Sequence, residues 1–136
     1  MDIKILIVDE STTISKIVAA AFESKNATVE SVANGKDALG KMKLTEPDIV
    51  IADADMQDLS GYDLSRQIKE IDQFSDTPVL LLVGSSNALD KEKFRNSKAE
   101  GYLAKPFKSD DLMTNVYKLL KIEEMKFGKP WTGLRE

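Results

Sequence analysis

The chain has 136 residues, 42% hydrophobic and 31% charged, which is ordinary for one globular domain. Its net charge of −4 lacks the basic excess of a nucleic-acid-binding domain. It contains no cysteine and no histidine, which excludes disulfides, thiolate or imidazole metal sites and phosphohistidine chemistry on this chain. The sequence shows no leader pattern and no apolar run of the ~20 residues that span a bilayer, so we expect a cytoplasmic location without membrane contact.

The first half of the chain alternates apolar runs with helical patterns. Residues 3–8 predict a strand, and Ser11 is expected to cap an amphipathic helix. The apolar face of that helix consists of Ile14, Ile17, Val18, Ala21 and Phe22. Residues 27–32 predict a more polar strand, as at a sheet edge, and a second helix follows Asn34-Gly35. Gly40 inside that helix costs about 1 kcal/mol relative to alanine.

The second half repeats this alternation. Residues 48–53 predict a strand buried on both faces, because their continuous apolar run at 49–52 ends abruptly in Asp53. A helix from Gly61 to Ile71, a strand at 79–83, a short polar helix around 89–99 and a strand at 101–104 follow. Ser109 is expected to cap a last helix. Residues 123–136 contain two glycines and a proline and predict a C-terminal tail or linker after a domain of residues 1–122.

Five strands in strict alternation with helices predict an α/β fold: a doubly wound, five-stranded parallel sheet with right-handed crossovers. Charged residues stand at three strand ends. Asp9 and Glu10 follow the first strand, Asp53 ends the third, and Lys105 follows the fifth. Because the carboxyl ends of parallel strands share one edge of the sheet, these residues are expected to converge in a ligand-binding crevice.

The expected cluster indicates phosphoryl transfer. Converging carboxylates repel one another unless a cation or a proton neutralises them, and oxygen ligands favour Mg²⁺ over zinc. A lysine binds a phosphoryl oxygen as a point charge, and a carboxylate can be the nucleophile that forms an aspartyl phosphate. The residues therefore predict Mg²⁺-assisted phosphoryl transfer onto Asp53.

Three motifs make residues 3–122 resemble the receiver domains of two-component response regulators, most closely small chemotaxis-type single-domain regulators. They are IVDES with Asp9 and Glu10, DADMQDLSG with Asp53 and Gly61, and YLAKPF with Lys105. The resemblance implies a flavodoxin-like (βα)5 receiver fold with strand order 2-1-3-4-5. It also implies self-directed phosphotransfer and autodephosphorylation rather than turnover of a substrate.

The resemblance also assigns roles. It makes Asp53 the phosphoacceptor and Tyr102 the aromatic switch residue, and it has Lys105 contact the phosphoryl group and precede a cis peptide bond to Pro106. The Mg²⁺ ligands that it implies are Asp9, Glu10, Asp53 and the backbone carbonyl of Asp55. The implied partners are a sensor histidine kinase or phosphotransfer protein and a downstream protein that binds the face of the fourth helix, fifth strand and fifth helix. No direct contact with nucleic acid or membrane is expected.

Two residues depart from the family pattern. Gln57 replaces a usual proline, and we expect it to loosen the loop without touching the chemistry. Val83 replaces the threonine or serine that bonds the phosphoryl group and triggers the switch. Losing one donor to a charged group costs about 1.5–3 kcal/mol, so we expect a weakened switch at Tyr102. The hydroxyls of Ser85 or Ser86 and the backbone N–H of Gly84 are candidate replacements.

Two alternatives remain. Val83 favours a pseudo-receiver, a protein-interaction module that works without phosphorylation, whereas the acidic residues and Lys105 argue against it. A phosphatase of the haloacid dehalogenase type also carries DxD after an apolar strand, with Thr or Val two residues beyond the second aspartate. Gln57 stands in that place here, and the chain has no room for a cap domain.

Overall fold

The computed structural model describes residues 2–84 and 88–121. One parallel sheet has the strand order β2-β1-β3-β4-β5, as expected. The strands are β1 (Ile3–Val8), β2 (Ala27–Val32), β3 (Ile49–Asp53), β4 (Val79–Val83) and β5 (Gly101–Ala104). The helices are α1 (Thr12–Ala21), α2 (Gly35–Thr45), α3 (Gly61–Lys69), α4 (Lys91–Ser97), α5 (Ser109–Leu120) and the short 3-10 helix η1 (Asp72–Phe74). The expected tail at 123–136 lies outside the described residues.

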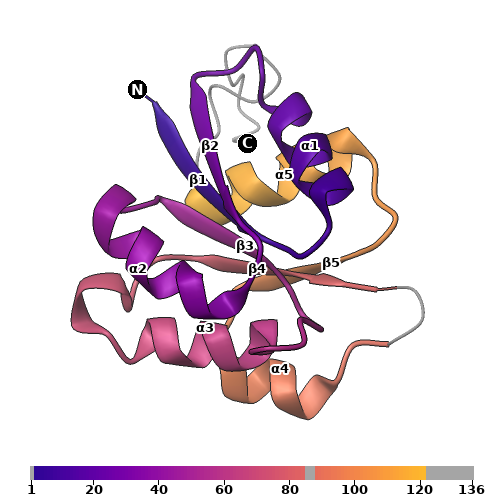
Figure 1. The fold of residues 1–136 in the computed structure, drawn as a ribbon. Helices are drawn as coiled ribbons and strands as arrows, with labels where there is room; N and C mark the ends of the chain where they lie inside the picture. Colours follow the sequence, from indigo (N-terminus) through magenta and orange to yellow (C-terminus); the bar gives the residue numbers. More distant parts are fainter. Residues whose placement is uncertain (1, 85–87, 122–136) are drawn as a thin grey trace.

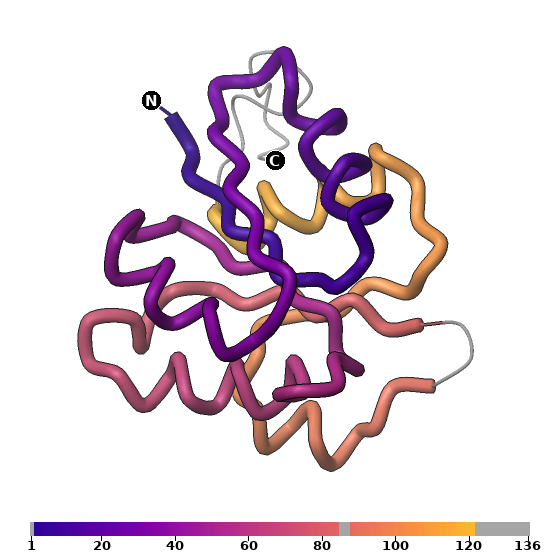
Figure 2. Tube along the Cα trace, in the orientation of Figure 1, coloured from indigo at the N-terminus to yellow at the C-terminus, as the bar shows by residue number. Residues whose placement is uncertain are grey.

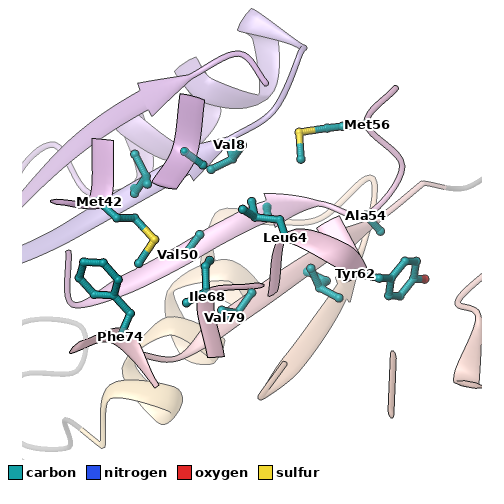
Figure 3. Close-up of a cluster of buried hydrophobic side chains, with 14 of the residues drawn as sticks. Val8, Met42, Val50, Ala54, Met56, Tyr62, Leu64, Ile68, Phe74 and Val79 are labelled. Atoms are coloured by element: carbon teal, nitrogen blue, oxygen red, sulfur yellow. The ribbon is translucent and has the colours of Figure 1, made fainter. Parts of the chain in front are cut away.

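The helices cover both faces of the sheet, with α1 and α5 on one side and α2, α3 and α4 on the other (Figure 1). Successive strand residues point to opposite faces, so each strand contributes to two separate cores. Leu81 of β4, for example, packs toward α3, and its neighbour Leu82 packs toward α5. Because both neighbours are apolar, the strand appears in the sequence as a continuous apolar run. Figure 3 shows the core beneath α2 and α3.

Side chains cap most of the helices. Ser11, Asn34, Ser60 and Asp90 each accept a backbone N–H in the first turn of α1, α2, α3 and α4. Such caps satisfy donors that a helix terminus leaves free. The expected cap at Ser109 is wrong: Lys108 is the N-cap residue of α5, without a side-chain hydrogen bond.

Two further details differ from expectation. Ile17 is 38% exposed rather than on the buried face of α1. The third helix ends at Lys69, and Ile71 precedes η1 instead of continuing the helix. Both differences concern apolar residues that periodicity alone assigns to a helix face. Within the described residues, no helix is both long and apolar enough to cross a membrane.

The tube view follows the chain from each strand into its next helix (Figure 2). All strands of the parallel sheet run in the same direction, so their carboxyl ends lie along one edge. Asp9, Asp53 and Lys105, which stand at the ends of β1, β3 and β5, therefore share this edge. The segments that lead into the strands lie at the opposite edge.

Candidate functional site

Three charged side chains meet at the carboxyl edge of the sheet. Asp9 follows β1, Asp53 is the last residue of β3, and Lys105 follows β5. The Lys105 Nζ lies 3.0 Å from Asp9 Oδ2 and 3.5 Å from Asp53 Oδ1. One ammonium group therefore faces two carboxylates, which leaves a net negative charge when both are ionised. The convergence expected from the strand ends is present.

Asp9 is the more tightly held of the two carboxylates. Its side chain is only 2% exposed. Its Oδ1 accepts the backbone N–H of Ser11 at 2.8 Å, and its Oδ2 accepts the Lys105 ammonium. Both oxygens of this buried carboxylate have a partner, which is the condition for keeping a charge inside a protein.

The two oxygens of Asp53 differ. Oδ1 accepts the backbone N–H of Asp55 at 3.3 Å and faces Lys105. No hydrogen bond or ion pair from residues 2–84 and 88–121 reaches Oδ2. Burial raises the pKa of the Asp53 carboxyl and the charge of Asp9 raises it further, outweighing the Asp55 N–H and Lys105, which lower it. Within the described structure, Asp53 is therefore incompletely neutralised, and only one of its two oxygens has a partner.

Glu10 is held by the loop after β3. Its Oε2 accepts the backbone N–H of Gln57 at 3.1 Å. Proline has no N–H to donate, so this contact depends on the departure from the family pattern at position 57. Residue 57 thus engages one of the expected metal ligands, while the expectation that Gln57 leaves the chemistry untouched stays a prediction.

The same loop is tied to α2. The Asp58 carboxylate accepts the backbone N–H groups of Gly35 at 3.3 Å and Lys36 at 3.0 Å, in the first turn of that helix. Slight desolvation raises the pKa of Asp58, but hydrogen bonds from backbone N–H groups, Lys36 first, lower it more, so the pKa lies below its ordinary value. An ionised Asp58 therefore links the acceptor loop to the N-terminus of α2.

The donor chemistry of the site suits a hard divalent cation, because carboxylates and a backbone carbonyl are the oxygen ligands that Mg²⁺ prefers. Asp9 and Asp53 already converge, whereas Glu10 is bonded to Gln57. In the described part of the chain, no group of three or more acidic, histidine or cysteine side chains is gathered closely enough to hold a metal ion. Of the expected ligand side chains, Asp9 and Asp53 are the two that the described structure brings to the same ammonium group.

The expected switch residues occupy different environments. Val83 is 4% exposed and belongs to the core beneath α3, while its carbonyl accepts the Lys105 N–H at 2.8 Å. Tyr102 is 48% exposed, and its ring packs edge-on against Phe94 of α4 with centroids 5.5 Å apart. Ser85 and Ser86, the candidate replacement donors, lie outside the described residues. Lys105 and Pro106 are joined by a cis peptide bond, as expected.

Gly61 fixes the start of α3 against the acceptor strand. Its N–H donates to the carbonyl of Ala54 at 2.9 Å. A Cβ on residue 61 would overlap the carbonyl oxygen of Asp53 and lie 2.9 Å from the Ala54 Cα. Only glycine allows this approach.

The family model that describes the response regulator receiver domain matches residues 5–117. The chain belongs to this family. It is 32% identical over 111 residues to protein PilG of Pseudomonas aeruginosa, covering 82% of each chain. It spans about half the length of other curated relatives, including 46% of the transcriptional regulatory protein TrcR of Mycobacterium tuberculosis. Receiver domains act in two-component signalling, where they interact with histidine kinases and downstream effectors.

Solved structures agree with this assignment. The chemotaxis response regulator CheY4 of Vibrio cholerae has a TM-score of 0.80 and 27% identity, covering 88% of this chain and 99% of that one. The receiver domain of the sensor histidine kinase PA1611 of Pseudomonas aeruginosa holds a magnesium ion in its active-site cleft. It is 24% identical with a TM-score of 0.79, covering 89% of this chain and 99% of that chain, and this likeness is one of fold.

One contact near the site does not follow from the sequence pattern. The Tyr62 hydroxyl accepts the backbone N–H of Asp90 at 3.1 Å, which joins α3 to the start of α4. Helical periodicity places Tyr62 on the buried face of its helix, and it is 6% exposed. A buried tyrosine hydroxyl usually has a hydrogen-bond partner, and this general rule is the signal that could have pointed to the contact.

Proposed function

We propose that this chain accepts a phosphoryl group on Asp53 from a phosphohistidine of a partner. The observation that supports this most is the state of the Asp53 carboxylate. It stands at the carboxyl edge of the sheet with Oδ1 held by Asp55 and Lys105, and Oδ2 has no partner among the described residues. That arrangement orients a nucleophile and leaves its reacting oxygen free.

In the proposed step, Asp53 Oδ2 attacks the phosphorus atom and forms an acyl phosphate. The P–N bond to the donor imidazole breaks, and its electron pair stays on the imidazole nitrogen, which takes up a proton. The Lys105 ammonium lies close to both Asp9 and Asp53. It therefore needs to move only a short distance to contact an oxygen of a phosphoryl group on Asp53. The group is later lost by hydrolysis: water attacks the phosphorus atom, the P–O bond to Asp53 breaks, and inorganic phosphate leaves with the carboxylate restored. The chemistry is therefore self-directed and not substrate turnover.

We further propose that Asp9, Asp53 and the backbone carbonyl of Asp55 would hold Mg²⁺, and that Glu10 would be a ligand only without its contact to Gln57. When bound, Mg²⁺ offsets the charge on the phosphoryl oxygens. The net negative charge of the two carboxylates around Lys105 supports this proposal, because a single ammonium group does not neutralise them. The residues themselves position the donors, since Ser11 and Asp55 fix one oxygen of each carboxylate.

The partners follow from the composition and the family. The chain has no histidine, so the phosphohistidine must belong to another molecule or domain. We propose a sensor histidine kinase or a phosphotransfer protein as that donor. We propose the face of α4, β5 and α5 as the surface for a downstream target, since Tyr102 and its Phe94 partner lie there.

A pseudo-receiver is the second candidate, and Val83 is the observation that favours it. Its side chain is buried in the core and has no donor for a phosphoryl oxygen. We therefore propose that phosphorylation moves Tyr102 less than a hydroxyl at position 83 would allow. A pseudo-receiver would keep the fold and a partner surface without forming an adduct.

Intact mass after incubation with acetyl phosphate and Mg²⁺ separates the two candidates. We expect one added phosphoryl group, which is absent without Mg²⁺ and absent in Asp53→Asn. Asp55→Asn, an exposed change in the same loop that retains the backbone carbonyl, is the matched control and should still gain the group. A folded protein that gains no mass from acetyl phosphate or from its kinase would instead be a pseudo-receiver.

A further inference from the structure

We propose that Tyr62 is a positioning residue that couples Asp53 to α4, along a route that does not pass through residue 83. This inference rests on the proposed function, because it concerns what the phosphoryl group at Asp53 changes elsewhere. The structure supplies a contiguous set of contacts from Asp53 to α4 and on to Tyr102, and the Tyr62 hydroxyl forms its central link.

The first link joins the acceptor strand to α3. Gly61, the first residue of α3, donates its N–H to Ala54 and approaches the Asp53 carbonyl too closely for any side chain. A shift of the backbone at residues 53 and 54 therefore moves the first turn of α3 with it. Packed interiors transmit such shifts because they have little free volume.

The second link joins α3 to α4. Tyr62 is the next residue, and its buried ring extends to the edge of the core with the hydroxyl directed away from Leu64 and Ile68 (Figure 3). The hydroxyl accepts the N–H of Asp90, the N-cap residue of α4. The carboxylate of Asp90 in turn accepts the Lys93 N–H, so the contact holds the first turn of α4.

A second hydrogen bond holds the other end of α4. The Ser65 hydroxyl, fully buried one turn further along α3, donates to the carbonyl of Ser97 at 2.9 Å. Between these two contacts, Phe94 of α4 packs edge-on against Tyr102. The short helix α4 is thus tied to α3 at both ends, and the Tyr62 contact is the one that directly follows Gly61 along α3.

This arrangement gives the chain a way to respond despite Val83. In the expected family mechanism a hydroxyl at position 83 moves toward the phosphoryl group, which valine cannot do. The route through Gly61 and Tyr62 needs only a movement of the backbone at Asp53. A phosphoryl group there can therefore shift α4 without a hydroxyl at position 83. The link depends on the hydroxyl and not on the ring. A phenylalanine would pack its ring in the same place but would have no hydroxyl to accept the Asp90 N–H.

Nuclear magnetic resonance with a non-hydrolysable analogue tests this proposal. Beryllofluoride with Mg²⁺ mimics a phosphoryl group on an aspartate, and the spectrum reports Asp53, Asp90, Phe94 and Tyr102 separately in the full chain. In wild type we expect analogue-induced shifts at all four. Tyr62→Phe should still bind the analogue at Asp53 but lose more than half of the shift at Phe94 and Tyr102.

Tyr117→Phe is the matched control. Tyr117 is also buried, but it lies on α5 across the sheet and packs against Phe22. The same loss of one hydroxyl there should leave the response at α4 unchanged. Hydrogen exchange without analogue adds a direct readout: the Asp90 amide should exchange about two- to tenfold faster in Tyr62→Phe, as expected for one lost hydrogen bond.

Each other outcome is decisive. If Tyr62→Phe binds the analogue and responds at Phe94 and Tyr102 like wild type, Tyr62 is not the link and the proposed phosphoacceptor role stands. Tyr62 is likewise excluded as the link if wild type binds the analogue without any response at α4, or if Tyr117→Phe loses the response equally. If wild type does not bind the analogue at Asp53, the proposed function fails and this inference fails with it.

Discussion

A lysine is paired with carboxylates at each of the two edges of the sheet where the strands begin and end. The two pairs differ in whether any carboxylate oxygen is left without a partner among the described residues. At the amino edge, the Lys69 Nζ donates to both oxygens of Glu100, at 2.6 and 2.8 Å, and to the carbonyl of Thr77. Glu100 also accepts the Val79 N–H. At the carboxyl edge, Lys105 divides its charge between Asp9 and Asp53, and one oxygen of Asp53 has no partner among the described residues.

The same residue types therefore give a closed structural pair at one edge and an open site at the other. A cavity of about 380 Å³ lies beside Lys69 and Glu100, yet their charges are already matched and offer little to a ligand. The open site has two carboxylates for one ammonium group. Unmatched charge, and an oxygen without a partner among the described residues, rather than cavity size, distinguish the edge that we propose to be reactive.

The largest effect should come from breaking the backbone contact that supports the open site. Gly61→Ala places a methyl group against the Asp53 carbonyl, so we expect the free energy of unfolding to fall by about 2–3 kcal/mol. Gly40→Ala, where the added methyl group meets no neighbour within 4 Å, should raise it by about 0.5–1 kcal/mol. Urea denaturation measures both, and an equal response of the two variants would contradict the contact.

Breaking the closed pair should cost about 2 kcal/mol. Lys69→Met keeps most of the buried stem but removes three hydrogen bonds and leaves Glu100 without its cation. The loss should not depend on Mg²⁺, because Glu100 has no second carboxylate partner at this edge of the described structure. Thermal unfolding with and without Mg²⁺ checks this, and recovery in Mg²⁺ would show that the amino edge also binds cations.

Breaking the open pair should cost less, about 1–2 kcal/mol, because the Lys105 side chain is more exposed than that of Lys69, 20% against 8%, and donates one hydrogen bond to the described residues instead of three. Lys105→Met leaves Asp9 and Asp53 without a cation between them. We expect Mg²⁺ to restore part of the lost stability, unlike in Lys69→Met. The same unfolding measurement applies, and a Mg²⁺ effect of equal size in the two variants would remove the distinction between the edges.

The smallest effect should come from Asp53→Asn, and its size depends on pH. Burial raises the pKa of the Asp53 carboxyl above its ordinary value of 3.8, so the folded protein binds that proton more tightly than the unfolded chain. The stability from this proton is present below the unfolded pKa and is lost as pH rises through the folded pKa. At neutral pH the substitution should therefore raise the free energy of unfolding, by less than about 1 kcal/mol, and the gain should vanish in acid.

Asp58→Asn is the control of opposite sign. Backbone N–H groups hold the Asp58 pKa below its ordinary value, so its carboxylate stabilises the fold above the unfolded pKa and stops doing so as pH falls through the folded pKa. Replacing it should lower stability at neutral pH and matter less in acid. The free energy of unfolding of each variant, measured against pH, checks this. If both substitutions change stability in the same direction at neutral pH, the opposite pKa shifts of Asp53 and Asp58 are contradicted.

The strands and the convergence of Asp9, Asp53 and Lys105 could be predicted from sequence because each follows from a local pattern. Apolar runs mark β1, β3 and β4, and a parallel sheet brings the strand ends together. Helix details were less predictable. The N-cap of α5 lies one residue before Ser109, a shift of the size common at helix ends, and periodicity alone does not show that Ile17 is 38% exposed.

The contacts that tie the site together could not be predicted, because each joins a side chain to a backbone N–H far along the chain. Glu10 and Gln57 are 47 positions apart, and Tyr62 and Asp90 are 28 apart. A backbone donor is present at every residue except proline, so its use leaves no trace in the sequence. Position 57 is an exception to this rule. Glutamine in place of the family's usual proline shows in the sequence that a backbone N–H is available to donate there.

The most direct test of the open-site account is to locate the phosphoryl group by chemical trapping. After incubation with acetyl phosphate and Mg²⁺, borohydride reduces an acyl phosphate and converts the phosphorylated aspartate to homoserine, which peptide mass mapping then locates. We predict homoserine at position 53 alone, since Asp9 has both oxygens engaged. Homoserine at Asp9, at Asp55 or at any other position, or at none in a folded protein, would contradict the assignment of Asp53 as the phosphoacceptor.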